Sequence, residues 1–333
     1  MFYEQPIYWI GFLVFVIVLL AFDLGVLNRK AHAPSLKEAA WLSVLWISIA
    51  LAFGVAVYVF LGQRQGVEYF TGWLLEKALS VDNLFVFVLV FAFFKLPPQY
   101  HHRVLFWGVL GALVMRGILI LVGATLLMRF EWIIYIFGAF LIYTGIRLAL
   151  EKEGSDPNLD SNLLLKLARR ILPMTSDYHE QRFAVRINRR LYFTPLILVL
   201  IVIESTDLVF AVDSIPAVIA VTKEPFIIFT SNVMAILGLR ALYFLLASAI
   251  DKFYYLKPAL SVILTFVGVK MVGEKLFHDS LHAALLPLTS DPEYFIVVAS
   301  MIFILLVLAV AVIASLVRSR SPVADAKAEP AAH

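Results

Sequence analysis

The sequence predicts an all-α polytopic membrane protein with about nine transmembrane helices. Of its 333 residues, 62% are hydrophobic and 15% are charged. Apolar runs of about 20 residues, the length that crosses the hydrocarbon core of a bilayer, recur along the whole chain. Alternating polar and apolar strands of about ten residues, which mark an outer-membrane barrel, are absent. The chain has no cysteine, so disulfides and thiolate metal sites are excluded.

Nine apolar segments define the expected helices. The first has no basic region before it and no clear small-residue cleavage site, so we expect a retained helix rather than a signal peptide. Only one substantial polar segment, between the fifth and the sixth, interrupts the series. The nine segments are 7–27, 39–61, 68–94, 104–127, 131–150, 193–222, 226–249, 258–274 and 293–317.

These segments divide the chain into six parts. The polar part contains an amphipathic basic piece, Leu163–Leu172, followed by a short hairpin that we expect to turn at Asn188 and Arg189. We interpret it as a cytoplasmic linker that lies on anionic lipid headgroups. The parts are 1–66, with two N-terminal transmembrane helices; 67–150, a first unit of three helices; 151–192, the cytoplasmic basic loop; 193–275, a second unit of three helices; 276–317, an outer loop and the last helix; and 318–333, a disordered cytoplasmic tail.

The distribution of basic residues predicts the orientation. Alternate connections between the nine segments hold 19 Lys and Arg residues, whereas the other connections hold five. Cytoplasmic loops carry the excess of positive residues. We therefore expect the N-terminus outside and the C-terminus in the cytoplasm, which an odd number of spans allows.

The two units of three helices resemble each other. Residues 80–85 (SVDNLF) match 205–210 (STDLVF), and an arginine within an apolar segment follows each match, Arg116 in the first copy and Arg240 in the second. Because each copy has an odd number of spans, the second must enter the membrane from the opposite side. Secondary transporters commonly have such inverted repeats, with a substrate site near the midplane between the copies.

Three carboxylates and a proline lie within the sixth apolar segment. Ionisable residues at membrane depth are costly, so each is a candidate functional residue. At 100° per residue, Glu204 and Asp207 share a face of a helix, whereas Asp213 lies roughly 180° from Glu204. Pro216 removes the hydrogen bond to the carbonyl of Val212, so we expect a helix break that turns Asp213 toward the other acids. Carboxylates with a bare carbonyl suit a hard divalent cation.

The inverted repeat would place the first helix of one copy beside the first helix of the other copy. Glu76, Asp82 and Asn83 are then expected to face the acids of the sixth segment. Five acids would meet three bases, and the excess of two negative charges equals the charge of one divalent cation. Without the cation, protons must neutralise them. We expect Arg116 and Arg240 to pair with the acids, because their positive charge repels a cation. Lys77 either pairs with an acid in the same way or extends toward the end of its helix.

Three segments resemble the signature segments of the TerC family: 76–85 (EKALSVDNLF), 204–217 (ESTDLVFAVDSIPA) and 230–246 (TSNVMAILGLRALYFLL). The likeness extends over most of the chain, and the length and the segment 183–195 look closest to the bacterial Alx branch. This resemblance implies a manganese exporter of the bacterial inner membrane, distantly related to LysE-type exporters. It also implies the ligand set Glu76, Asp82, Glu204, Asp207 and Asp213, with neutral oxygens from Asn83 and Ser214.

We therefore expect a secondary transporter, not an enzyme, that exports Mn²⁺ in exchange for protons. Its expected partners are Mn²⁺, protons and the lipid bilayer, with no prosthetic group and no nucleic acid. Hard oxygen ligands disfavour Cu(I) and zinc, and Mg²⁺ sheds its water reluctantly. Ligand chemistry leaves Ca²⁺ open, and the choice of Mn²⁺ rests on the resemblance. The alternatives are an exporter of Ca²⁺ or of an amino-acid-like solute, an intramembrane aspartyl protease, and a non-transporting organiser of a membrane stress complex.

Overall fold

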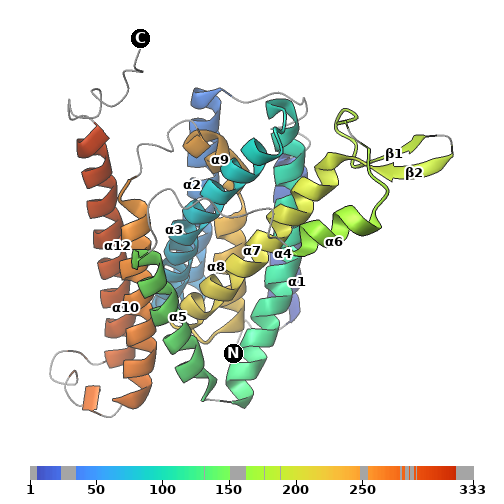
Figure 1. The fold of residues 1–333 in the computed structure, drawn as a ribbon. Coiled ribbons are helices and arrows are strands. Elements are labelled where there is room, and N and C mark those ends of the chain that lie inside the picture. The colour runs from blue at the N-terminus through green and yellow to red at the C-terminus, as the bar shows by residue number, and fades with distance from the viewer. Residues whose placement is uncertain are drawn as a thin grey trace, which may run out of the picture.

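A bundle of long helices makes up the computed structural model (Figure 1). The structure describes residues 6–23, 35–130, 132–150, 163–175, 177–187, 189–247, 254–277, 280–281, 285, 289 and 291–319. Within these residues the only sheet is a two-stranded hairpin, which projects from the side of the bundle. The prediction of an all-α membrane protein is confirmed, and each of the nine apolar segments is helical over most of its described residues.

The elements follow one another in an order that matches the predicted segments. In chain order they are α1 (Pro6–Phe22), α2 (Leu36–Phe60), α3 (Gln63–Phe93), α4 (Pro98–Arg129), α5 (Ile133–Leu150), α6 (Leu163–Ile171), β1 (Ala184–Ile187), β2 (Arg190–Phe193), α7 (Pro195–Ile219), α8 (Pro225–Ile236), α9 (Leu239–Ala247), α10 (Leu256–Leu276) and α12 (Pro292–Ser319).

Several helix ends coincide with residues that favour them. The Ser35 side chain accepts a hydrogen bond from the backbone N–H of Glu38 at 3.3 Å and so caps α2. Prolines occupy the first turn of α4, α7 and α8, where a missing N–H costs no helical hydrogen bond. Gly62, at φ +120°, separates α2 from α3, a conformation that glycine adopts without strain. These signals place short turns between neighbouring helices.

Six of the described helices are long and apolar enough to cross a membrane: α2, residues 98–123 of α4, α5, α7, α10 and α12. The pair α8 and α9 meets the same requirement together, but the two helices are bent by 43° at their junction. Helix α1 is apolar but has 17 residues, and α3 has 31 residues that include five charged ones. The chain is therefore an integral membrane protein with several spans.

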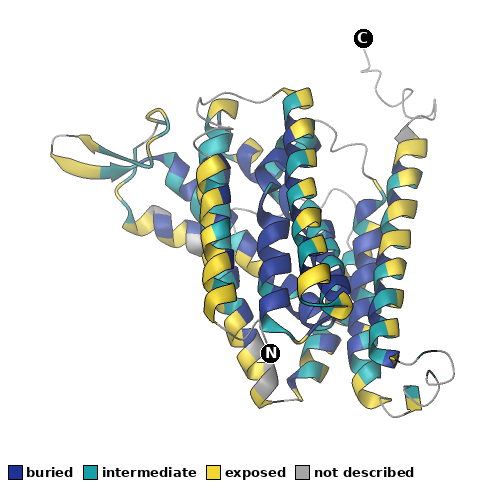
Figure 2. Cartoon of the chain, turned by 180° about the vertical axis from the view of Figure 1, so that it is seen from behind, coloured by how far each residue is buried: buried dark blue, intermediate teal, exposed yellow. Residues whose placement is uncertain are grey.

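The helices pack in layers, with buried inner helices and outer helices that expose apolar side chains (Figure 2). Helices α3 and α7 contact each other, α8 packs on α3, and α4 packs on α7. Helices α5 and α10 approach closely, because a Cβ atom at Gly268 would lie 2.7 Å from the carbonyl oxygen of Gly138. On α12, Val310, Ile313 and Val317 are each more than 60% exposed, as expected for a face in contact with lipid.

The predicted helix break at Pro216 is wrong. Helix α7 continues through Pro216 and ends at Ile219. The residues on either side of the proline, Ile215 and Ala217, are buried in the core, so packing holds this turn helical. The break occurs in the next span instead, where Gly238 at φ +84° separates α8 from α9.

The predicted hairpin between the fifth and sixth segments is confirmed. Strands β1 and β2 are antiparallel, and the pairing of Ile187 with Arg190 places the turn at the predicted position. The hydroxyl of Tyr178 donates to the carbonyl oxygen of Phe94 at 2.8 Å, which anchors the segment before β1 to the end of α3. The guanidinium carbon of Arg103 on α4 lies 5.4 Å from the ring centre of Phe183 and anchors the segment a second time.

Candidate functional site

A buried arginine on α4 holds two carboxylates from two other helices. Arg116 is 1% exposed. Its Nη1 donates to Glu76 on α3, while its Nη2 and Nε donate to the two oxygens of Asp207 on α7 at 3.0 and 3.2 Å. Nη1 also lies 3.4 Å from the hydroxyl of Ser214 on α7. Fork-like pairing of this kind gives strong, directional hydrogen bonds, so Arg116 joins α3, α4 and α7 inside the bundle.

Helix periodicity explains how these side chains come together. Residues seven apart share a face of an α-helix, which aligns Asp207 with Ser214 on α7 and Glu76 with Asn83 on α3. The amide nitrogen Nδ2 of Asn83 donates to Oδ1 of Asp207 at 3.3 Å. Helix α3 therefore contributes two side chains, and helix α7 two more, to what we call the central cluster: Glu76, Asn83, Arg116, Asp207 and Ser214.

The central cluster carries more negative than positive charge. Its two carboxylates, when ionised, face one guanidinium, which leaves an excess of one negative charge. Oε2 of Glu76 and Oδ1 of Asn83 are buried and have no hydrogen-bond partner within the described part of the chain. Buried polar atoms without partners are rare in folded proteins, and a water molecule or an ion is a common explanation. The cluster thus combines surplus negative charge with open oxygen atoms.

Two other predicted ligands on α7 point elsewhere. The carboxylate of Glu204 packs against α4 at Gly111, where an added Cβ atom would overlap it. Its Oε2 is buried without a hydrogen-bond partner in the residues that the structure describes. Asp213 instead accepts a hydrogen bond from the hydroxyl of Thr144 on α5 at 3.3 Å. Because α7 is not broken at the proline, Asp213 keeps the direction that a continuous helix gives it, and the expected turn toward the other acids does not occur.

The remaining predicted ligands do not complete a metal site. The side chain of Asp82 on α3 lies outside the described residues. Val212, whose carbonyl oxygen was the predicted ligand, lies within the continuous helix α7, where the expected break does not occur. Lys77 donates to the carbonyl oxygen of Ala235 on α8 at 3.1 Å rather than to a carboxylate. Within the part of the chain that the structure describes, no three His, Asp or Glu side chains are grouped closely enough to hold a metal ion. Between Glu76 and Asp207, the place expected for a cation is taken by the guanidinium.

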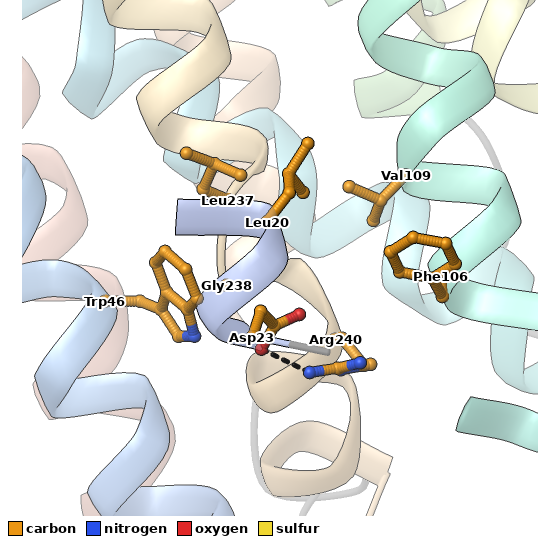
Figure 3. Close-up of a pocket in the computed structure, with 8 residues that line it drawn as sticks. All are labelled: Leu20, Asp23, Trp46, Phe106, Val109, Leu237, Gly238 and Arg240. Atoms are coloured by element: carbon orange, nitrogen blue, oxygen red, sulfur yellow. Dashed lines mark hydrogen bonds and ion pairs between the residues drawn. The ribbon is translucent and has the colours of Figure 1, made fainter. Parts of the chain in front are cut away.

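A second ion pair lies at the break between α8 and α9 (Figure 3). Nη2 of Arg240 donates to Asp23 at the end of α1, and Nη1 lies 2.8 Å from Nε2 of His102 on α4. Trp46 and Gly238 help to line a cavity of about 20 Å³ beside the pair, enough room for one water molecule. The expectation that Arg240 pairs with the ligand acids is therefore wrong, because its guanidinium pairs with Asp23 instead.

Asp23 is a buried charged residue that the sequence analysis missed. It lies near the end of the first predicted segment, 7–27, where an acidic side chain can extend to the interface. An available signal was the lack of any other candidate partner for Arg240 on the same helix, since α9 contains no acid.

This fold and the central cluster define the class of the protein. It is a helical membrane protein with several spans and with charged residues buried between its helices. The model of the Integral membrane protein TerC family matches residues 61–322. The chain therefore belongs to the TerC family, and the resemblance noted from its sequence segments is confirmed.

Relatives in several bacteria are identical to this chain at nearly half of the aligned residues. An uncharacterized membrane protein, STKORF319, from Myxococcus xanthus is 46% identical over 325 residues, or 97% of each chain. Proteins named as a membrane-bound redox modulator, Alx, from Salmonella typhi and from Escherichia coli K12 are each 46% identical over 282 residues. That alignment covers 82% of this chain and 87% and 88% of the two relatives. No solved structure gives a significant match.

Proposed function

We propose that the chain is a secondary transporter that exports Mn²⁺ from the cytoplasm in exchange for protons. The observation that carries this proposal is the central cluster, in which two buried carboxylates share one arginine, and Oε2 of Glu76 and Oδ1 of Asn83 have no hydrogen-bond partner among the described residues. Ionisable groups at this depth are costly, and in membrane proteins they commonly mark the path of an ion or a proton. An excess of negative charge favours a cation as the transported substrate.

Arg116 gives the cluster a way to exist without substrate. In the arrangement described above, the guanidinium neutralises Glu76 and hydrogen-bonds Asp207. A divalent cation that enters competes with the guanidinium for the same oxygens, and protons compete as well, because an unpaired buried carboxylate binds a proton readily. Competition of these three positive species for one set of oxygens is the thermodynamic basis that we propose for exchange.

The packing of the helices supports an inverted repeat, which is common among secondary transporters. We propose that α3, α4 and α5 form one unit and that α7, the α8–α9 pair and α10 form the other. An inverted repeat demands that each contact between the units has a counterpart. Exchange of the two units converts the contact of α3 with α8 into the contact of α7 with α4, and both are present. The same exchange leaves the contacts of α3 with α7 and of α5 with α10 unchanged. With α1, α2 and α12 crossing as well, the proposed number of spans is nine.

Hard oxygen ligands narrow the choice of cation. The cluster offers carboxylate, amide and hydroxyl oxygens, which suit Mn²⁺, Ca²⁺ and Mg²⁺ better than softer metals. We propose Mn²⁺ on the family resemblance and keep Ca²⁺ as the competing substrate. We also propose the bacterial inner membrane as the location, with the N-terminus outside and the basic hairpin segment in the cytoplasm, in line with the excess of basic residues on that side.

Transport into proteoliposomes tests the proposal. Purified protein is reconstituted with a Mn²⁺-quenched dye inside the vesicles in one series and a pH-sensitive dye in another. We expect Mn²⁺ entry that accelerates when the vesicle interior is acidic, so that protons leave as Mn²⁺ enters, with proton movement detected in the second series. Asp207→Asn should abolish entry, whereas Asp177→Asn, an exposed acid in the hairpin segment, should not change it.

Each outcome bears on a separate part of the proposal. Mn²⁺ entry that ignores an imposed pH gradient would defeat proton exchange alone. Entry of Ca²⁺ in preference to Mn²⁺ would correct the substrate. A reconstituted protein that carries neither cation, or an Asp207→Asn variant as active as the wild type, would defeat transport through the central cluster and favour a non-transporting role.

A further inference from the structure

Asn232 on α8 is a fully buried side chain that none of the contacts described so far uses. It is 0% exposed, and neither Oδ1 nor Nδ2 has a hydrogen-bond partner within the described part of the chain. Burial of an amide is strongly unfavourable when the hydrogen bonds that its oxygen and nitrogen made to water are not replaced. The two polar residues before it, Thr230 and Ser231, satisfy their hydroxyls with carbonyl oxygens of their own helix. Asn232 is therefore the polar side chain of α8 that requires an external partner.

The neighbours of Asn232 on α8 define the direction in which it points. Ser231 faces α3, since its Oγ would lie 2.9 Å from a Cβ atom at Gly72. Phe229 contacts α4, since its ring would lie 3.4 Å from a Cβ atom at Gly117. At 100° per residue, Asn232 is 100° from Ser231 and 60° from Phe229, within the sector between them. Its side chain thus points between α3 and α4.

The packing one turn below supports this direction. Ile228 lies four residues before Asn232, on nearly the same face of α8. It packs in a buried cluster that includes Leu75 of α3 and Ile215 and Val218 of α7. The face of α8 that carries Asn232 is therefore the inward face, toward the junction of α3, α4 and α7.

Asn232 and Glu76 lie at neighbouring levels along the helix axes. Gly72 of α3 faces Ser231 of α8, and Lys77 of α3 donates to the carbonyl oxygen of Ala235, so the two helices run side by side over these residues. Glu76 lies between the two contacts on α3, as Asn232 does on α8. Glu76 also shares the face of Gly72, one turn apart. The unpaired Oε2 of Glu76 and the unpaired amide of Asn232 thus belong to one region of the bundle interior.

We propose that Asn232 supplies a neutral oxygen ligand to the transported divalent cation, opposite Oε2 of Glu76. This inference rests on the proposed function and extends the central cluster to α8. Amide and carboxylate oxygens are the donors that hard divalent cations take up in proteins. A ligand from α8 also gives the bent α8–α9 span a direct contact with the substrate. Binding of the cation is thereby coupled to the conformation of the break at Gly238.

Equilibrium binding to the purified full chain tests the inference without a transport assay. The probe is Mn²⁺ alone, since the electron paramagnetic resonance signal of the free aqua ion disappears when the ion is bound. Asn232→Leu replaces the amide by an apolar side chain of similar shape, and we expect Mn²⁺ affinity to fall about tenfold or more. The thermal unfolding midpoint without metal should stay the same or rise, because two unpaired polar atoms are removed.

Two further variants make the test specific. Thr230→Val removes a buried hydroxyl from the same helix on a different face and should bind Mn²⁺ as the wild type does. Asn232→Asp keeps an oxygen at the same position and should bind at least as tightly. Wild-type affinity in Asn232→Leu, or a tenfold loss in Asn232→Asp, would overturn the inference and leave the proposed function standing. Absence of Mn²⁺ binding in the wild type would overturn both.

Discussion

Removal of Arg116 should be the most destabilising single change in the central cluster. Arg116→Met leaves the carboxylates of Glu76 and Asp207, which are 0% and 3% exposed, without their only positive partner among the described residues. Breaking a buried ion pair by deleting one partner typically costs about 3–5 kcal/mol, because an uncompensated charge stays buried. Two carboxylates share this arginine, so we expect a loss of about 4 kcal/mol or more in the free energy of unfolding.

Neutralising an acid instead should cost much less. Asp207→Asn weakens two hydrogen bonds from the guanidinium, and a bond to a charged group is worth about 1.5–3 kcal/mol. The same change removes the surplus negative charge and leaves Glu76 and Arg116 as a balanced pair. These effects oppose each other, so we expect a loss of no more than about 2 kcal/mol.

The double variant Arg116→Met with Asp207→Asn separates the effect of unpaired charge from the effect of the lost arginine side chain. We expect it to be more stable than Arg116→Met alone, because it leaves one buried carboxylate without a positive partner instead of two. A coupling energy of about 1–3 kcal/mol in the double-mutant cycle is the expected size for residues in direct contact. The assay is reversible unfolding in mixed detergent micelles, followed by tryptophan fluorescence. Additive effects, or an Arg116→Met variant as stable as the wild type, would refute the argument that the pair is buried and coupled.

Three further changes test other contacts. Gly111→Leu should lower the free energy of unfolding because its side chain would occupy the space of the Glu204 carboxylate packed there, whereas Gly108→Ala, with its nearest neighbour at 3.2 Å, should have little effect. Gly268→Leu should separate α5 from α10 and lower the free energy of unfolding by about 1–3 kcal/mol, while Gly273→Ala, with open space around it, serves as the control in the same unfolding assay. Asp23→Asn should leave its arginine partner buried without a counter-charge and lower the thermal midpoint, and an unchanged midpoint would contradict the ion pair.

Apolar segments and local signals in the sequence were sufficient for the helices and the hairpin. A span of about 20 apolar residues can satisfy its backbone in lipid only by forming helical hydrogen bonds, so composition alone predicts the secondary structure. The direction of Asp213 away from Glu204 also follows from helix periodicity, before any tertiary contact is considered. The family, too, could be recognised from three segments, because they are long and carry polar and charged residues in an apolar background.

Charge pairing required the tertiary structure. Arg116 and Arg240 occupy matching places in the two sequence copies, yet one joins Glu76 and Asp207 while the other pairs with Asp23 of α1. Nothing local distinguishes them, because a long side chain can reach acids on several neighbouring helices.

The sequence by itself determined that this chain lies in a membrane as a helical bundle and which acids are costly to bury. Only the tertiary structure decided which charges meet, because that depends on helix directions set by packing. Pro216, surrounded by close contacts, stays within its helix, whereas Gly238, free to adopt positive φ, turns the next span. Helix formation is a property of each segment in lipid, whereas ion pairing depends on the relative placement of segments far apart in the chain.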